Sequence, residues 1–278
     1  MRQGFTRPFS PQGRASMLPP MPWRFAADQM LVHFRADPDV LDSYLPPPMT
    51  PNPDRRGEAF LWTPNLNVHP VDEEVNATIK NPHRTHYNVC VIAIPGLFNG
   101  EPRLISAFQW TDRDWLVVLS WLIGTCAKQV EFRDSGTHPM FARIDSNRTG
   151  GLGSQVLRTL SRNGEQLMYI SCTPEENIEA ADMSFFTSTM PLLSERHIPD
   201  FNVPPTGKPL VHDLTQMLLT DSAGQNFRRG PATLEFNALA DNEELGSLQP
   251  TEVLGGYRWE TSWIMPGIKV VHDYLAEG

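Results

Sequence analysis

The sequence predicts a mainly β (α+β) protein of one domain, in which an antiparallel sheet system closes, or nearly closes, into a barrel around an apolar cavity. At least eight short segments are apolar or alternate between apolar and polar residues, as strands do. The chain has 26 prolines in 278 residues, a content that fits short strands and loops better than long helices. No internal repeat or change of composition marks a second domain.

The first elements are an arm, a strand and a short helix. Residues 1–22 are polar and then proline-rich, so we expect an arm there and the sheet domain over 23–278. Residues 30–35 alternate between apolar and polar side chains and predict a strand. Asp37 is a typical N-cap, and the apolar residues of 38–45 follow at helical spacing up to a run of prolines. This segment predicts a short helix.

A hairpin and a second helix follow. Residues 87–94 are apolar and rich in β-branched side chains, and Asn99-Gly100 is a hairpin signal before a return strand at 103–110. A helical segment is expected at 115–124. Residues 59–62 form a short apolar segment, and further strands are expected at 140–145, 167–173, 209–213, 232–238 and 257–264.

Charge and composition exclude several classes of protein. The formal net charge of −9 argues against a nucleic-acid partner or an anionic membrane surface. The longest mostly apolar run, 115–127, is shorter than the about 20 residues that span a bilayer. The N-terminus lacks the apolar stretch of a signal peptide. We therefore expect a soluble, cytoplasmic protein whose partner is a small-molecule substrate.

Motifs for cofactors and metals are absent from the sequence. There is no Walker loop or nucleophile elbow, and the pair His83 and His86 has no evident third ligand. No cofactor and no metal are expected. The acidic stretch 241–244 is interpreted as a solvated face. Three cysteines are too few for a disulfide framework, and we expect buried thiols at Cys90, Cys126 and Cys172.

Lys128 stands apart because it ends the apolar run 115–127. Burial at that position would favour the neutral amine, which can attack a carbonyl group and form a Schiff base. The alternative is that the side chain extends from the end of a buried segment and keeps its charged group in water. The local sequence leaves both interpretations open.

Five sequence features occur in a particular order along the chain. Their order and spacing together are more informative than any one of them. They are the segment 34–48, the segment 86–89 before an apolar strand, the spacing from there to Lys128, and the segments 229–234 and 265–275. Together they resemble the acetoacetate decarboxylase superfamily, of which the chain is identified as a divergent member over about residues 20–276. The resemblance implies a cone- or barrel-like sheet around an apolar cavity and assembly into homo-oligomers.

The resemblance also implies roles for individual residues. Lys128 takes the place of the lysine that forms an imine with an oxo acid, and Arg35 takes the place of an arginine that holds the substrate. Tyr87 is a candidate for proton transfer. Two family glutamates are missing, since Val89 stands at one position and no carboxylate lies near Trp62, and Gln129 replaces a second lysine. The expected pocket is therefore apolar, and its candidate substrate-binding residues are Val89, Gln129, Trp62, Trp121, Tyr257 and Glu260.

Three functions remain open at this point. The first is a lyase of the decarboxylase or aldolase–dehydratase type that acts on an oxo acid or a polyketide-like carbonyl compound through an imine at Lys128. The second uses the same apolar cavity without a covalent bond, for cyclisation or dehydration of a larger secondary metabolite. The third is a barrel that binds a hydrophobic ligand and leaves it unchanged, because a fold does not fix a function.

Overall fold

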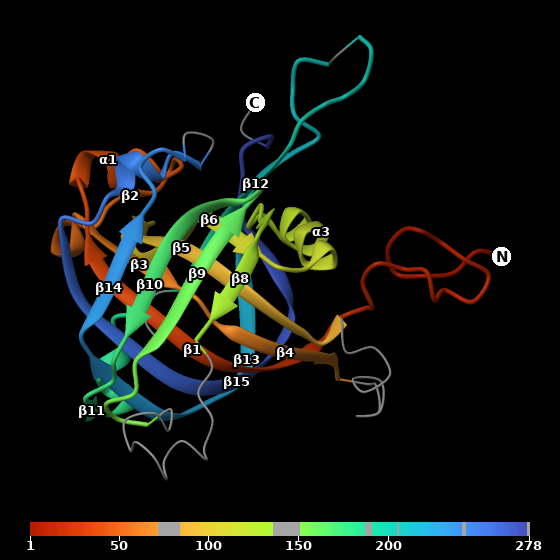
Figure 1. Cartoon of the computed structure of the whole chain (residues 1–278). Coiled ribbons are helices and arrows are strands. Elements are labelled where there is room, and N and C mark those ends of the chain that lie inside the picture. The colour runs from red at the N-terminus through yellow and green to blue at the C-terminus, as the bar shows by residue number, and fades with distance from the viewer. Residues whose placement is uncertain (72–83, 136–150, 187–190, 205, 241–242, 277–278) are drawn as a thin grey trace.

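The computed structural model is mainly β, as the sequence predicts, and its strands form a large and a small sheet (Figure 1). It describes residues 1–71, 84–135, 151–186, 191–204, 206–240 and 243–276. The strands are β1 (Trp23–Arg35), β2 (Thr50–Pro51), β3 (Glu58–Trp62), β4 (Asn65–Pro70), β5 (His86–Phe98), β6 (Glu101–Thr111), β7 (Lys128–Gln129), β8 (Glu131–Asp134), β9 (Val156–Arg162), β10 (Glu165–Cys172), β11 (Glu176–Asn177), β12 (Leu192–Ile198), β13 (Val211–Gly230), β14 (Ala232–Phe236) and β15 (Glu252–Asp273). Within these ranges the α-helices are α1 (Pro38–Asp42) and α3 (Asp114–Ile123), and short 3-10 helices lie at Pro53–Arg55, Ala180–Met183 and Leu245–Leu248.

The large sheet closes on itself. Strands β5, β3, β1, β15, β13, β12 and β6 pair in that order, and β6 pairs again with β5, so that they form a ring. The neighbours are antiparallel except for β12 and β6, which run parallel, as do β6 and β7. The expected antiparallel sheet is therefore present except for these two parallel pairings at β6. The chain between β6 and β12 passes through α3 and the second sheet, and such a long connection allows parallel pairing.

The second sheet, in the order β14, β10, β9 and β8, packs against the outside of the ring (Figure 1). Side chains alternate along each ring strand, so one set faces this sheet and the other faces the ring's interior. On β1, Val32 and Phe34 join Ile170 of the second sheet in one apolar cluster. Phe25 and Leu31 of the same strand belong to a separate cluster. The ring wall therefore separates an inner core from an inter-sheet core.

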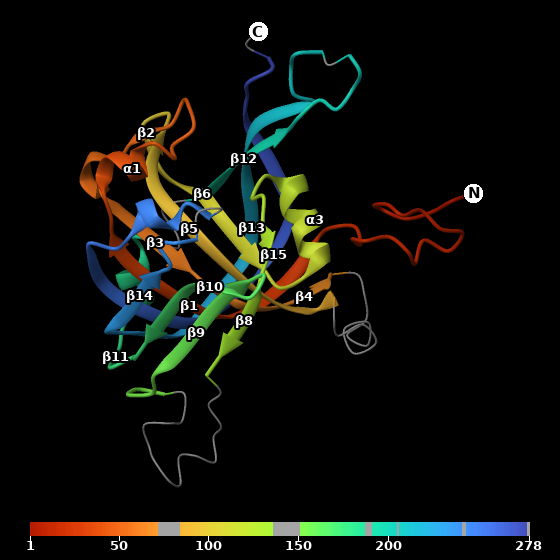
Figure 2. The same cartoon turned by 45° about the horizontal axis from the view of Figure 1, so that its top comes forward.

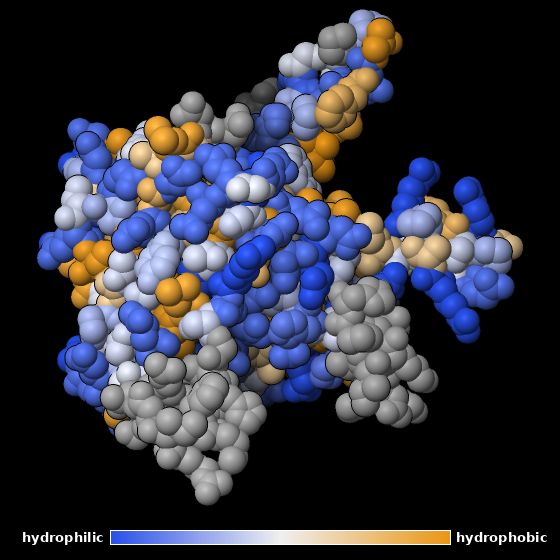
Figure 3. All heavy atoms as spheres, viewed as in Figure 1, coloured by the Kyte–Doolittle hydropathy of each residue, from blue (hydrophilic) through white to orange (hydrophobic). Residues whose placement is uncertain are grey.

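Two segments extend from this body. The N-terminal part of the chain projects before β1, and the segment between β12 and β13 projects from another side (Figures 1 and 2). Both carry exposed apolar side chains (Figure 3), among them Phe5 at 58% and Phe201 at 81% exposure. Leu18, close to β1, is by contrast buried in the inner core.

Several predicted elements differ in extent. The predicted strand at 30–35 is the end of a longer strand, and the predicted helix at 38–45 ends at Asp42. Asp37 does cap that helix, accepting hydrogen bonds from the backbone of the first turn. The strand predicted at 140–145 lies outside the described residues.

Cysteines, helix lengths and groups of metal-ligating side chains can be described over these residues. The three cysteines are free; Cys90 and Cys172 are buried, whereas Cys126 is half-buried. No helix in this part of the chain is long and apolar enough to cross a membrane. No group of three or more metal-ligating side chains occurs there. His83 lies outside the described residues, and Nε2 of His86 is 2.8 Å from Oδ1 of Asn65.

Candidate active site

The ring encloses an apolar cavity of about 70 Å³. Every ring strand contributes a side chain, and α3 contributes several more. Room for one water takes about 10–15 Å³ of such volume, so the cavity has space for about five waters or one small ligand. Its lining includes Phe25, Trp62, Tyr87, Val89, Gln109, Leu116, Met217 and Trp263.

Polar groups in this cavity are few and uncharged. Among the described residues, Oγ1 of Thr125 and Nε1 of Trp263 have no hydrogen-bond partner, although these residues are only 6% and 8% exposed. A buried donor without a partner costs about 1–3 kcal/mol. Burial, with a smaller contribution from Asp112, raises the pKa of Tyr87 well above its ordinary value, so this residue stays a neutral phenol. An acceptor oxygen of a bound ligand would take hydrogen bonds from the hydroxyl of Thr125, the indole N–H of Trp263 and the phenol of Tyr87.

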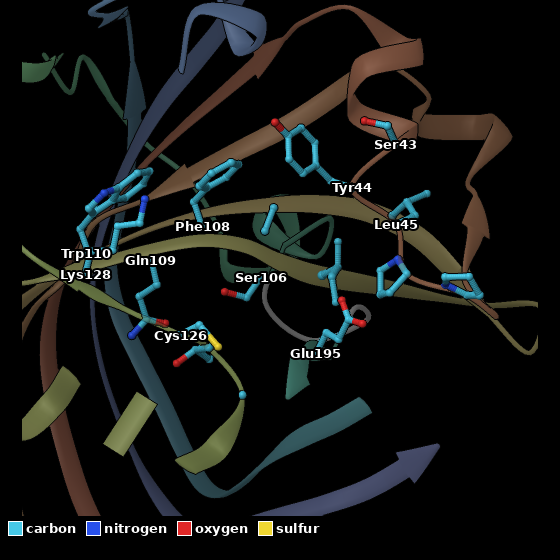
Figure 4. Close-up of a pocket in the computed structure, with 16 residues that line it drawn as sticks. Ser43, Tyr44, Leu45, Ser106, Phe108, Gln109, Trp110, Cys126, Lys128 and Glu195 are labelled. Atoms are coloured by element: carbon cyan, nitrogen blue, oxygen red, sulfur yellow. The ribbon is translucent and has the colours of Figure 1, made fainter. Parts of the chain in front are cut away.

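Lys128 does not face this cavity. It pairs in parallel with Trp110 of β6, and paired residues share a face of a sheet. Trp110 belongs to the inter-sheet core, whereas the next residue, Gln109, lines the cavity. Figure 4 shows Lys128 beside Trp110, with Gln109 pointing the other way. The structure therefore places Lys128 and Tyr87 on opposite sides of the ring wall.

Outside the ring, Lys128 belongs to a charged cluster around Glu243. Nζ of Lys128 is 2.9 Å from Oε2 of Glu243, and Nη1 of Arg162 is 2.6 Å from Oε1. Trp110 donates a third hydrogen bond to Oε2, at 3.0 Å. Burial tends to raise the pKa of Glu243, but the bonds from Lys128, Trp110 and Arg162 outweigh it and lower that pKa. The interpretation of 241–244 as a solvated face is therefore wrong at Glu243, whose side chain is 3% exposed.

An open cleft of about 500 Å³ lies at the same edge of β6 (Figure 4). Lys128 and Phe108 line it, together with Tyr44 and Glu195. Gln109 and Thr125 line both the cleft and the ring cavity. The cleft and the cavity are therefore neighbours across the ring wall.

The structure brings some predicted site residues together. Tyr87, Val89 and Trp62 line the ring cavity, and Nε1 of Trp62 donates a 2.6 Å hydrogen bond to Gln29. Tyr257 is half-buried in the inner core and contacts Phe185 with ring centroids 5.2 Å apart. Tyr87, Val89 and Trp62 thus contribute to an apolar cavity, the kind of pocket that the missing glutamates predicted, and Tyr257 lies in the core around it.

The remaining predicted site residues lie elsewhere. Arg35 is at the end of β1, half exposed and 2.7 Å from Glu252. Glu260 accepts hydrogen bonds from two amide side chains on the outer side of β15. Trp121 is 46% exposed on α3, and Gln129 is an exposed residue of β7. None of these four lines the ring cavity among the described residues.

Sequence reasoning missed Gln109, Thr125, Trp263 and Glu243. A signal for Trp263 existed, since Tyr257, Trp259 and Trp263 lie at even spacing on a predicted strand and so share one face. Glu243 had no such signal, because its three donors come from β6, β7 and β9. Only the folded chain brings them together.

A closed β ring with an apolar cavity and a second sheet outside it define the class of protein with the acetoacetate decarboxylase fold. The family model described as "Acetoacetate decarboxylase (ADC)" matches residues 6–275, and the chain belongs to this family. Comparison with the curated proteins gives no match.

Solved structures share this fold at low sequence identity. The enduracididine biosynthesis enzyme MppR, complexed with the condensation product of pyruvate and imidazole 4-carboxaldehyde, has a TM-score of 0.83 at 23% identity over 99% of this chain and 98% of that one. An acetoacetate decarboxylase-like enzyme from Sphingomonas wittichii RW1 has a TM-score of 0.83 at 22% identity over 98% and 100%. The acetoacetate decarboxylase from Legionella pneumophila has a TM-score of 0.75 at 18% identity over 98% and 97%.

Proposed function

We propose that this chain is a lyase-type enzyme that holds a small, uncharged carbonyl compound non-covalently in the ring cavity. The observation that carries the proposal is the lining of that cavity: it is aromatic and neutral, and two buried groups, Oγ1 of Thr125 and Nε1 of Trp263, lack partners among the described residues. No lysine, arginine or carboxylate is among the described lining residues. A carboxylate ligand would therefore have no counter-charge there.

The proposed chemistry uses hydrogen bonds to the carbonyl oxygen. In cleavage of a β-hydroxy ketone, the hydroxyl loses its proton to water, the bond between the α- and β-carbons breaks, and negative charge develops on the ketone oxygen as an enolate, whose α-carbon then takes up a proton from water. In dehydration, an α-proton is lost to form the same kind of enolate, and the β-hydroxyl takes up a proton and leaves as water. Donors placed at this oxygen in a dry site stabilise the charge. Tyr87 is suited to this role because its raised pKa keeps the phenol protonated at neutral pH. Trp263 supplies a second donor that cannot ionise.

The relatives support the general class of reaction. MppR has been solved in complex with a condensation product of pyruvate and an aldehyde, and such a condensation forms a carbon–carbon bond next to a carbonyl group. Cleavage of such a bond is the reverse reaction. The apolar cavity favours a substrate without the carboxylate of pyruvate.

Diacetone alcohol is a suitable probe because it is an uncharged β-hydroxy ketone. Carbon–carbon cleavage gives two molecules of acetone, and dehydration gives mesityl oxide, so product analysis separates the two lyase reactions. We expect the wild-type protein to accelerate one of them. We expect Tyr87→Phe to lower the rate by about 100-fold, the usual effect of removing one donor to a developing oxyanion.

Two comparisons make this experiment specific. The ring centroids of Trp263 and Phe25 lie 5.1 Å apart. Trp263→Phe keeps an aromatic ring at this contact but removes the indole N–H donor, so it should also lower the rate. Tyr169→Phe removes a phenol on β10, outside the ring, and should leave the rate unchanged. Equal rates in Tyr87→Phe and Tyr169→Phe would reject the cavity as the site.

Imine formation at Lys128 is the second candidate function. The observation in its favour is access, since Lys128 lines the open cleft and its side chain is 37% exposed. Attack on a carbonyl requires the neutral amine, so Nζ would have to lose its proton and leave Glu243. Borohydride reduction in the presence of acetoacetate or pyruvate would fix an adduct on Lys128 if this candidate holds.

A further inference from the structure

The ring cavity occupies only one part of the ring interior. Every second side chain of a ring strand points inward. Among the described inward-facing residues, Trp263 of β15 and Trp62 of β3 line the cavity. Trp259 and Phe60 lie further along the same strands and belong to the inner core, but they are not among the described lining residues. The cavity therefore stops at Trp62.

Aromatic side chains fill the ring interior behind Trp62. Phe186, which lies between β11 and β12 in the chain, contacts Trp62 with ring centroids 5.9 Å apart and Phe60 at 5.4 Å. Its neighbour Phe185 stacks on Phe60 at 5.7 Å with an interplanar angle of 28°. Met183 of the same segment is 1% exposed and belongs to the inner core. This segment therefore supports the indole of Trp62 on the side away from the cavity.

A hydrogen bond fixes the same indole from β1. Nε1 of Trp62 donates to Oε1 of Gln29 at 2.6 Å. Gln29 is 2% exposed, and its strand pairs with β3. Turning the indole aside would break this bond and leave a buried donor and a buried acceptor without each other, which is unfavourable. Trp62 is thus held between Gln29 and Phe186.

We propose that Trp62 sets the length of the ligand that the ring cavity accepts, and that Gln29 is the positioning residue for its indole. The inference rests on the proposed function, because it concerns the ligand of the same cavity, and it narrows the substrate class. A short or compact ketone fits in the cavity of about 70 Å³ in front of Trp62. A long unbranched ketone meets the indole.

Two unbranched ketones, 2-hexanone and 2-nonanone, test this limit by isothermal titration calorimetry with the full chain. The second ketone has three more methylenes, and each methylene that is buried in an apolar site raises the affinity about fourfold. We expect the wild-type protein to bind 2-nonanone no more tightly than 2-hexanone. Trp62→Leu extends the cavity toward Phe186, so it should bind 2-nonanone about tenfold more tightly than 2-hexanone, as expected if two of the three methylenes are buried.

Two further variants make the test specific. Trp121→Leu is the same substitution at a residue of α3 that is 46% exposed and is not among the described lining residues, so it should keep the wild-type preference. Gln29→Met removes the acceptor of the indole bond with little change of size. It should raise the ratio of the two affinities severalfold, whereas a role in stability alone would leave this ratio unchanged. A cooperative urea transition verifies that each variant is folded.

Three results would overturn this inference. One is a wild-type protein that already binds 2-nonanone about tenfold more tightly than 2-hexanone. Another is the wild-type preference in both folded variants, Trp62→Leu and Gln29→Met. The third is an absence of ketone binding in both the wild type and Trp62→Leu. The proposed function is tested separately, by turnover of diacetone alcohol and its loss in Tyr87→Phe, so either proposal can fail while the other holds.

Discussion

The ammonium nitrogen of Lys128 lies 2.9 Å from Oε2 of Glu243, a carboxylate that is 3% exposed. This ion pair lies between the ring and the second sheet, on the other side of the wall from Tyr87. The most conspicuous lysine of the sequence is thus joined to a structural cluster, and the cavity inside the ring contains neutral groups. Because the ion pair lies outside the ring and the neutral groups lie inside it, we propose non-covalent catalysis in the ring cavity.

The first prediction concerns the buried carboxylate. Glu243→Gln leaves Lys128 and Arg162 close together without their shared negative charge. We expect the free energy of unfolding to fall by about 2–3 kcal/mol, less than for a fully buried pair because both cations are about one third exposed. Urea denaturation measures this loss. The neighbouring exposed residue supplies the control, since Glu244→Gln should change stability by less than about 0.5 kcal/mol.

The same carboxylate predicts a dependence of stability on pH. The hydrogen bonds from Lys128, Trp110 and Arg162 outweigh burial and lower the pKa of Glu243 in the folded state. Its contribution is therefore complete above the ordinary value of 4.5 and is lost as the pH falls through the lower folded value. Denaturation curves between neutral and acidic pH should show this loss in the wild type. A Glu243→Gln protein with the same acid-dependent loss would contradict the assignment.

Arg158 of β9 connects the second sheet to the ring. It is 5% exposed and donates hydrogen bonds to Asp134, Thr63 and Asn88. Lysine cannot reproduce this planar set of donors, so Arg158→Lys should lower the free energy of unfolding by about 2–3 kcal/mol. Thermal and urea unfolding test the prediction.

Arg133 provides the matched control for that substitution. Its side chain is 79% exposed and lies 3.8 Å from Glu131. Arg133→Lys should be neutral within about 0.5 kcal/mol. Equal free energies of unfolding for Arg158→Lys and Arg133→Lys would contradict a role of Arg158 in holding the second sheet against the ring.

Two adjacent glycines of β15 make a further test. A Cβ added at Gly256 would lie 2.7 Å from Sγ of Cys172 and 2.8 Å from Cβ of Ala232. Gly256→Ala is therefore expected to destabilise the protein by about 1–3 kcal/mol through overpacking. At Gly255 the nearest atom to such a Cβ is 3.7 Å away, so Gly255→Ala should be tolerated. The opposite order of stabilities would contradict the packing of β15 on β10 and β14.

Much of the fold could be predicted from the sequence because strands have a period of two. The alternation in 30–35 and 257–264 identified strands that the structure contains within β1 and β15. Their full lengths were missed, since β15 has 22 residues and pairs with β13 through several irregularities in register. Such bulges leave no fixed pattern in the sequence.

The candidate site was only partly predictable, and the reason is register. A shift of one residue along a strand moves a side chain to the opposite face of the sheet. Spacing along the chain indicated that Lys128 lies near the ring. Its pairing with Trp110 of β6, however, directs the lysine side chain out of the ring. The apolar cavity itself was predictable, because the residues at Val89 and Trp62 replace carboxylates with apolar side chains.

The most direct test combines turnover and covalent trapping in one sample. The wild-type protein is incubated with diacetone alcohol, and acetone and mesityl oxide are measured in one aliquot before reduction. The remainder is treated with borohydride, and the protein is examined by intact mass and peptide mass. The account predicts product formation, an unchanged protein mass and activity that survives the reduction. A reduced adduct on Lys128 with loss of activity would contradict non-covalent catalysis in the ring cavity and would establish the imine mechanism.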